Sequence, residues 1–115
     1  MVVIEAKLNI ENSGDISFEA NVLGITKDIA GAEDKGIFEQ EILPESLNII
    51  ENILKNTKVF NPAYYNDFIA KLLNIIVAKA KEKNYRLKRI GQNEKYMTVT
   101  QLEFYKEEND NRKRY

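Results

Sequence analysis

Apolar and polar residues alternate along the first 22 residues in two runs, which are separated by Asn12, Ser13 and Gly14. Strict alternation over this length is typical of strands with one buried face, and the intervening residues are common in turns. We therefore predict an N-terminal β-hairpin. Its apolar face is formed by Ile4, Ala6, Leu8, Ile10, Ile16, Phe18, Ala20 and Val22.

The region between this hairpin and the first clear helix is less regular. Residues 24–36 contain three glycines and no sustained period, which indicates a connection with room for a single helical turn. Residues 36–42 alternate two apolar side chains with Glu39 and Glu41. This alternation favours a short third strand at a charged edge of the sheet.

Two stretches have the apolar spacing of amphipathic helices. Residues 43–56 place their apolar side chains within an arc of roughly 160°, and Pro44 lies in the first turn, where proline is favoured. Residues 61–84 have a wider arc of roughly 200°, which requires cover on two sides. Asn61 and Asn84 are suited to cap the two ends of this long helix. The short link between the helices predicts that they pack as an antiparallel pair.

Residues 85–105 are rich in β-branched and aromatic side chains and have a loop at residues 91–94, which predicts a second hairpin. Within its last strand the apolar residues change from odd-numbered to even-numbered positions, and so from one face of the strand to the other. This change predicts a bulge near Thr100 or Gln101, or a strand that is covered on both sides. The element order is ββ(β)ααββ, with the optional third strand in parentheses. It predicts an α+β fold, a two-layer sandwich in which an antiparallel sheet built from an N-terminal and a C-terminal β-hairpin packs against two helices.

We expect residues 1–105 to form a single α+β domain and residues 106–115 to form a charged, flexible tail. The 115 residues include no cysteine and no histidine, which excludes disulfides, thiol nucleophiles and imidazole proton shuttles. The sequence has neither a signal-peptide pattern nor an apolar run of roughly 20 residues. We therefore expect a soluble, cytoplasmic protein without membrane association.

Acidic and basic residues are unevenly distributed along the chain. Residues 1–57 contain 11 Asp or Glu and 4 Lys or Arg, a net charge of −7, whereas residues 58–115 contain 7 and 13, a net charge of +6. The formal net charge of −1 conceals this asymmetry. It divides the candidate binding residues into a basic set and an acidic set.

The basic set surrounds the junction of the long helix and the second hairpin, and aromatic residues are interleaved with it. Such a mixture is suited to neutralise phosphates and to stack on bases. Alternatively, the cations complement the dipole of the helix, and the basic hairpin neutralises the acidic one across strands. Strand alternation also places Arg89 on the opposite face from Arg86 and Lys88, and we favour the structural explanation. The basic set is formed by Lys79, Lys81, Lys83, Tyr85, Arg86, Lys88, Arg89 and Lys95.

The acidic set comes from the first hairpin and the predicted third strand. It is formed by Glu11, Asp15, Glu19, Glu39 and Glu41. A contiguous negative surface of this kind attracts a basic partner. Acidic residues are also common on the solvated face of a sheet and on edges that must not aggregate. We favour this ordinary explanation for the acidic set as well.

The sequence contains no recognisable catalytic, cofactor-binding or metal-binding motif. Asp28, Glu33 and Asp34 have oxygen atoms that suit Ca²⁺ or Mg²⁺, but their spacing matches no calcium loop. Without histidine or cysteine, an enzyme would need paired carboxylates, a lysine or a tyrosine, and no spacing singles out such a set. We expect no cofactor.

Three functional hypotheses follow from these observations. We prefer a small, non-catalytic protein that binds another macromolecule through its charge-polarised surface, with a protein preferred as the partner. One alternative is a nucleic-acid-binding module that uses residues 79–95. The other alternative is an enzyme that depends on carboxylates or on a metal ion. The sequence leaves the oligomeric state open.

Overall fold

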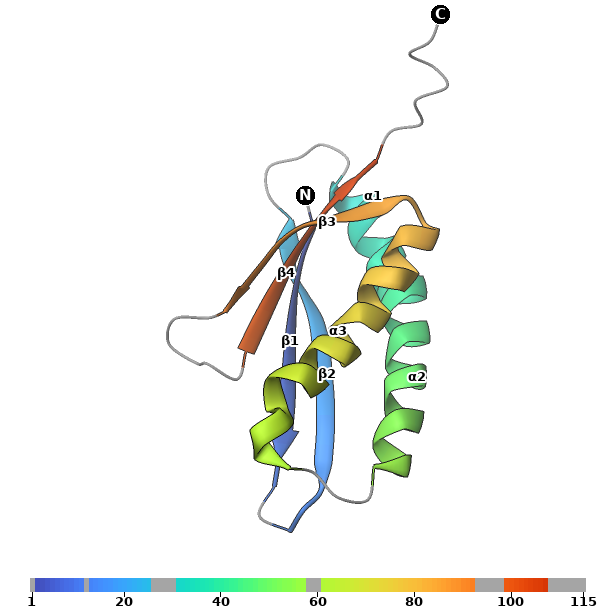
Figure 1. The fold of residues 1–115 in the computed structure, drawn as a ribbon. Helices are drawn as coiled ribbons and strands as arrows, with labels where there is room; N and C mark the ends of the chain where they lie inside the picture. The colour runs from blue at the N-terminus through green and yellow to red at the C-terminus, as the bar shows by residue number, and fades with distance from the viewer. Residues whose placement is uncertain (1, 12, 26–30, 58–60, 93–98, 108–115) are drawn as a thin grey trace, which may run out of the picture.

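The fold has two layers, an antiparallel sheet and two helical segments that cover one of its faces (Figure 1). The four strands are β1 (Val2–Ile10), β2 (Ile16–Ile25), β3 (Tyr85–Gln92) and β4 (Val99–Lys106). The predicted α+β sandwich of two hairpins and two helices is confirmed. The computed structural model describes residues 2–11, 13–25, 31–57, 61–92 and 99–107.

The strand order in the sheet is β2-β1-β4-β3, so the two hairpins join through β1 and β4. Val2 lies opposite Phe104 and Ile4 lies opposite Leu102, and all four side chains are fully buried. The buried face that we predict for the first strand is therefore confirmed. Because β1 and β4 are central, β2 and β3 form the two edges of the sheet.

A tight turn closes the first hairpin. The Glu11 N–H donates to the Asp15 carbonyl at 2.8 Å, and the Gly14 N–H donates to the Glu11 carbonyl at 2.9 Å. Gly14 has a φ of +94°, a conformation that glycine adopts far more readily than other residues. This glycine fixes the place where the chain reverses, and with it the register of β1 and β2.

The helical layer begins with one continuous helical run. It comprises α1 (Gly31–Ile37), a π-helical turn η1 (Phe38–Ile42) and α2 (Leu43–Asn56). The third strand predicted over residues 36–42 is therefore wrong. Phe38 and Ile42 are four residues apart, a spacing that fits a helical period as well as a strand period, and both are buried in the core.

The π-helical turn ends at Ile42, two residues before Pro44, which the sequence places at a helix start. A proline inside a helix has no N–H to donate, and its ring collides with the carbonyl four residues earlier. In η1 the hydrogen bonds span five residues, as from the Leu43 N–H to the Phe38 carbonyl. We infer that this wider turn relieves the collision and lets the helix continue through the proline.

The second helical segment is the long helix predicted over residues 61–84. It consists of η2 (Pro62–Tyr64) and α3 (Tyr65–Glu82), and in Figure 1 it runs in the opposite direction to α2. The Ala63 N–H donates to Asn61 Oδ1 at 2.9 Å, and Asn84 has a φ of +68°, so both predicted caps are confirmed. The buried side chains of α3 are Ile69, Leu72, Leu73, Ile76 and Ala80.

The irregularity of the second hairpin lies in β3. β4 pairs with β1 without a register shift, and Thr100, Leu102 and Phe104 are all buried on one face. The register shift occurs between Leu87 and Arg89 of β3. The bulge predicted in β4 is therefore wrong, because the extra residue belongs to the neighbouring strand.

A buried hydrogen bond joins the start of β3 to α1. The Tyr85 hydroxyl donates to Asp34 Oδ1 at 2.5 Å, and the two residues are only 1% and 5% exposed. Burial, together with the bond to Asp34, raises the pKa of the Tyr85 phenol well above its usual range, so that it remains a donor at any ordinary pH. The Phe38 ring packs edge-on against Tyr85, with 4.8 Å between the ring centroids.

Tyr85→Phe should destabilise the protein, because it leaves the buried Asp34 carboxylate without its donor. We expect the free energy of unfolding to fall by about 1–3 kcal/mol, measured by urea denaturation at neutral pH. The matched control is Tyr105→Phe, at a residue that is 46% exposed, and its effect should stay below about 0.5 kcal/mol. Equal losses in the two variants would show that the Tyr85 hydrogen bond does not stabilise the fold.

Candidate functional site

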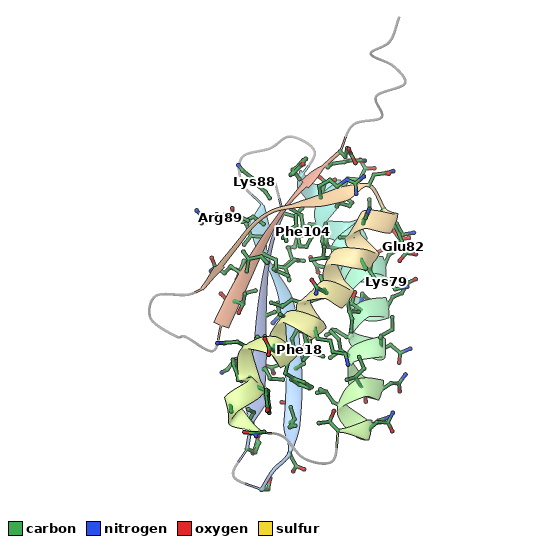
Figure 2. All side chains as sticks on the ribbon, in the orientation of Figure 1. Phe18, Lys79, Glu82, Lys88, Arg89 and Phe104 are labelled. Atoms are coloured by element: carbon green, nitrogen blue, oxygen red, sulfur yellow. The ribbon has the colours of Figure 1, made fainter. Side chains whose placement is uncertain are left out.

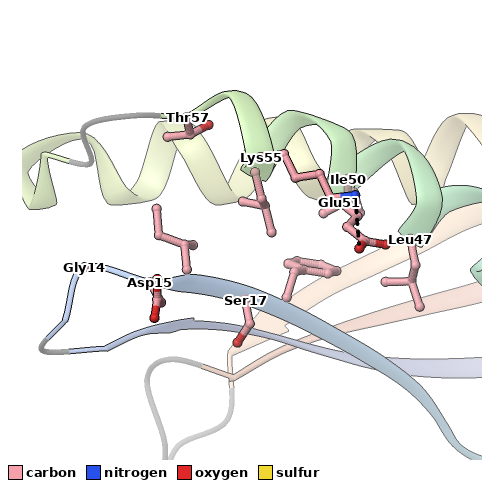
Figure 3. Close-up of a pocket in the computed structure, with 11 residues that line it drawn as sticks. Gly14, Asp15, Ser17, Leu47, Ile50, Glu51, Lys55 and Thr57 are labelled. Atoms are coloured by element: carbon pink, nitrogen blue, oxygen red, sulfur yellow. Dashed lines mark ion pairs between the residues drawn. The ribbon is translucent and has the colours of Figure 1, made fainter.

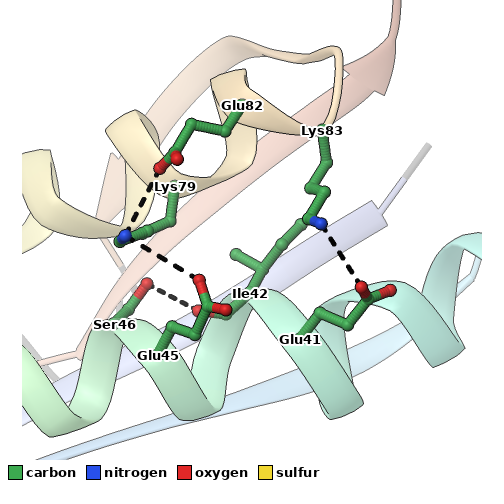
Figure 4. Close-up of polar contacts among 7 residues, drawn as sticks. All are labelled: Glu41, Ile42, Glu45, Ser46, Lys79, Glu82 and Lys83. Carbon is green, nitrogen blue, oxygen red and sulfur yellow. Dashed lines mark hydrogen bonds and ion pairs between the residues drawn. The ribbon is translucent and has the colours of Figure 1, made fainter.

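The cations near the end of α3 form ion pairs with carboxylates of the helical layer (Figure 4). Lys79 Nζ lies 3.8 Å from Glu45 Oε2 and 3.4 Å from Glu82 Oε2. Lys83 Nζ lies 3.3 Å from Glu41 Oε1. Two members of the basic set are thus paired within the fold. Their partners lie on helical elements, so these pairs are not the cross-strand neutralisation that the sequence predicts.

The cations of β3 lie on another part of the surface, as Lys88 and Arg89 show in Figure 2. Because of the bulge, Arg86 and Arg89 both pair with residues on the outer face of the sheet, away from the helices. The prediction that Arg89 lies on the opposite face of the sheet from Arg86 is therefore wrong. The Arg86 guanidinium contacts the Glu107 carboxylate, and Arg89 Nε lies 3.3 Å from Glu103 Oε2. The basic set is therefore divided between two surfaces.

The other members of the basic set differ in burial. Tyr85 is a core residue and not a surface aromatic available for base stacking. Lys81 and Lys88 are exposed and form no ion pair within the described part of the chain. Lys95 lies outside the described residues. The structure thus does not bring cations and an exposed aromatic together at Tyr85.

The acidic set is divided as well. Glu39 and Glu41 lie on η1 and not on a strand. They form ion pairs with Lys35 at 3.6 Å and with Lys83 at 3.3 Å. These two carboxylates therefore do not extend the acidic surface of the first hairpin.

Three carboxylates of the acidic set remain at the first hairpin. Glu11, Asp15 and Glu19 are exposed and form no ion pair with any residue that the structure describes. Glu11 and Asp15 flank the turn, and Glu19 lies on the outer face of β2, opposite Lys7 of β1. The hydrogen bonds to Asp15 and Glu19 come from uncharged side chains, at 3.1 and 3.4 Å.

An open groove lies between β2 and α2 and ends beside this acidic turn (Figure 3). Its volume is about 660 Å³, within the range of ligand-binding pockets. Phe18, Leu47 and Ile50 contribute apolar side chains to its lining, and polar side chains make up a comparable share of it. The groove is lined by Gly14, Asp15, Ile16, Ser17, Phe18, Leu47, Ile50, Glu51, Leu54, Lys55 and Thr57.

A second cavity continues along β2 and the start of α2, and residues of α1 and η1 also line it. Its volume is about 310 Å³, and it shares Leu47 with the first. It is lined by Ala20, Asn21, Val22, Lys35, Glu39, Leu43, Pro44 and Leu47. The two cavities, which we call the β2–α2 groove, follow β2 from the turn at Gly14 as far as Val22.

Sequence periodicity does not reveal this groove. It assigns Phe18 and Leu47 to apolar faces, yet both are only partly buried at the margin of the core. Periodicity identifies which face of an element is apolar and does not determine how completely another element covers it. One feature of the sequence does point to this site. The segment that forms β2 contains a single charged residue, Glu19, which is little charge for a strand at the edge of a sheet.

Comparison of the chain with protein-family models, with curated proteins and with solved structures gives no significant match. Within the described ranges, no group of three potential metal ligands lies close enough together to hold an ion. Of the acidic residues considered for a cation, Asp34 is bonded to Tyr85 and Asp28 lies outside the described residues. None of the described helices is sufficiently long and apolar to cross a membrane.

The ion pairs lead to a prediction about nucleic-acid binding. Each cation that neutralises a phosphate adds roughly 0.7–0.9 to the slope of log affinity against log salt. For a labelled single-stranded oligonucleotide, Lys81→Gln with Lys88→Gln should reduce this slope. Lys79→Gln with Lys83→Gln should leave the slope nearly unchanged, because these cations are already paired with carboxylates. Fluorescence anisotropy from about 20 to about 150 mM salt measures both slopes, and a larger reduction in the second variant would contradict the prediction.

Proposed function

We propose that this chain is a small, non-catalytic binding protein whose partner is a protein with a basic surface. One juxtaposition supports this proposal: Asp15 lines the end of the β2–α2 groove, and the exposed Glu11 and Glu19 belong to the same hairpin. None of these three carboxylates has an ion pair among the described residues. Charges of one sign attract and orient a partner of the opposite sign. The groove, with the apolar side chains of Phe18, Leu47 and Ile50 in its lining, supplies contact area that is buried on binding.

A protein partner fits this surface better than a nucleic acid does. The carboxylates at the hairpin repel phosphates. Most of the described cations elsewhere are paired with carboxylates, and Lys81 and Lys88 are the ones of the basic set that remain unpaired among the described residues. The groove therefore favours basic polypeptide over the phosphate backbone.

The polar side chains of the groove offer little for catalysis. Its cations are Lys55, whose Nζ lies 3.7 Å from Glu51 Oε1, and Lys35, whose Nζ lies 3.6 Å from Glu39 Oε1. Lys55 and Glu51 are 69% and 65% exposed, and Lys35 and Glu39 are about half-exposed. They are thus not desolvated in the way that activates a lysine or carboxylate for acid–base chemistry, and we assign them to the polar rim of a binding surface.

Neutralising the acidic hairpin should weaken partner binding. The test variant combines Glu11→Gln, Asp15→Asn and Glu19→Gln, and the tagged protein is used to capture partners from a lysate of its source organism, with quantification by mass spectrometry. We expect recovery of the specific partner to fall by roughly tenfold or more, since each exposed charge contact contributes up to about 1 kcal/mol. Raising the salt from about 0.1 to about 0.5 M should also reduce the recovery.

The matched control removes the same charge elsewhere, with Glu33→Gln, Glu45→Gln and Glu82→Gln. These exposed residues lie on α1, α2 and α3. The control should retain the partner. If every captured protein is lost equally from both variants, or from neither, the acidic hairpin is not the binding surface.

A further inference from the structure

The two edges of the sheet differ in how they are protected. β3 carries three cations and contains the bulge at Lys88. Cations and bulges are features that prevent an edge strand from pairing with another chain. β2 has Glu19 as its single charge and keeps a regular register with β1 from Ile16 to Val22. Over that length, and among the described residues, β2 has neither a bulge nor a cation to protect its edge.

The free backbone groups of β2 belong to residues whose side chains face the groove. In an antiparallel pair, alternate residues exchange hydrogen bonds with the partner strand, and the residues between them point their N–H and C=O groups away. The Glu11 N–H donates to the Asp15 carbonyl, so these two residues form a hydrogen-bonded pair, and every second pair along the register of β1 and β2 is bonded in the same way. The residues that bond to β1 are therefore Ser17, Glu19 and Asn21. The groups that point to the open edge are those of Ile16, Phe18, Ala20 and Val22.

A strand added at this edge would place every second side chain in the groove. Strand residues advance about 3.3 Å each, so the segment from Ile16 to Val22 offers about 23 Å of edge. The two cavities, of about 660 and 310 Å³, lie along this segment between β2 and α2. Their floor includes Phe18, Leu47 and Ile50, so the side chains that enter are expected to be apolar.

The charges around the edge indicate the other side chains of the added strand. On the helical rim, Glu51 is paired with Lys55, and Lys35 is paired with Glu39. Lys7 faces Glu19 from β1, one strand further from the edge. The charges left beside the edge within the described residues are carboxylates, so the outward side chains of an added strand are expected to be basic.

A second copy of this chain is a poorer occupant than a foreign strand. It would bring a second β2 and the same acidic turn, because both copies have the same sequence. Like charges on adjacent strands are destabilising. Charge complementarity therefore favours a basic segment of another protein.

We propose that β2 is a strand-addition site for an extended segment of a partner protein in which apolar and basic residues alternate. The segment pairs antiparallel with β2, its apolar side chains enter the β2–α2 groove, and its lysines or arginines lie on the outer face with Glu19. This inference rests on the proposed function. It adds the mode of binding and the sequence pattern that the partner must contain.

The test uses a fluorescein-labelled peptide of about nine residues in which valine and lysine alternate, long enough to cover the edge. If its valines enter the groove, the valine N–H groups point to β2 and the lysine N–H groups point to solvent. N-methylation of the valines should weaken binding by at least roughly tenfold, because several hydrogen bonds are lost. N-methylation of the lysines should leave binding within about threefold of the parent peptide. Fluorescence anisotropy measures all three affinities, and equal effects of the two methylations would overturn the proposal.

Amide NMR provides a readout that requires no change in the protein. On addition of the parent peptide, the amides of Ile16, Phe18, Ala20 and Val22 should become protected from hydrogen exchange. The amides of Ser17, Glu19 and Asn21 are already bonded to β1 and should change little. Protection spread evenly over both sets, or located on another element, would contradict strand addition at β2.

A pair of protein variants tests the groove itself. Leu47→Gln changes the partly buried residue shared by both cavities, whereas Ile49→Gln changes a neighbouring α2 residue that is 37% exposed and does not line either cavity. Peptide binding should fall roughly tenfold in the first variant only. Circular dichroism confirms that each variant is folded, and equal affinities of the two variants would overturn the assignment of the groove.

These results separate the inference from the function on which it rests. Suppose that the acidic hairpin is required for partner capture but that N-methylation of the valines and of the lysines affects peptide binding equally. Strand addition is then wrong, and the proposed function stands. If partner capture is also independent of the hairpin, both are wrong. A concentration-dependent dimer that the peptide dissociates would assign the β2 edge to a second copy of this chain and would overturn the foreign occupant.

Discussion

The antiparallel pairing of β1 with β4 is the constraint on which the rest of the structure depends. It joins the two ends of the chain, with Val2 opposite Phe104, and so brings two hairpins that are local in sequence into one sheet. The apolar faces of the central strands are then buried under the helical layer. Non-local pairing of this kind becomes favourable only when the packing it permits offsets the entropy of closing a long loop. Here that packing includes the Tyr85–Asp34 bond and the Phe38 ring against it.

The same pairing decides which strands are exposed at their edges. β3 becomes an edge that carries cations and a bulge, and β2 becomes an edge that carries almost no charge. An edge strand offers unpaired N–H and C=O groups in a regular row, which is a hazard in a protein without a partner and a binding device in one that has a partner. The β2–α2 groove supports the second interpretation, because it places the apolar side chains of Phe18, Leu47 and Ile50 beside that row.

Among the described residues, two ion pairs join the acidic half of the sequence to the basic half. The helical run from α1 to α2 supplies Glu41 and Glu45, which pair with Lys83 and Lys79 of the basic half. Such exposed pairs contribute little to stability individually, but they remove charge from the surface that a partner meets. The imbalance that survives near the first hairpin is smaller than the sequence suggests, and it adjoins the groove.

The sequence by itself determined the α+β class, both hairpins, the long helix and its caps at Asn61 and Asn84, because periodicity and capping are local properties of the chain. It did not determine the helical state of residues 36–42, where the spacing of Phe38 and Ile42 fits two periods and packing selects one. Nor did it determine the bulge in β3, which places the Arg89 side chain on the opposite face of the sheet from the one that strict alternation predicts. The open edge and the groove were decided by tertiary structure alone, since strand order and the fit of α2 against β2 arise only when distant segments meet.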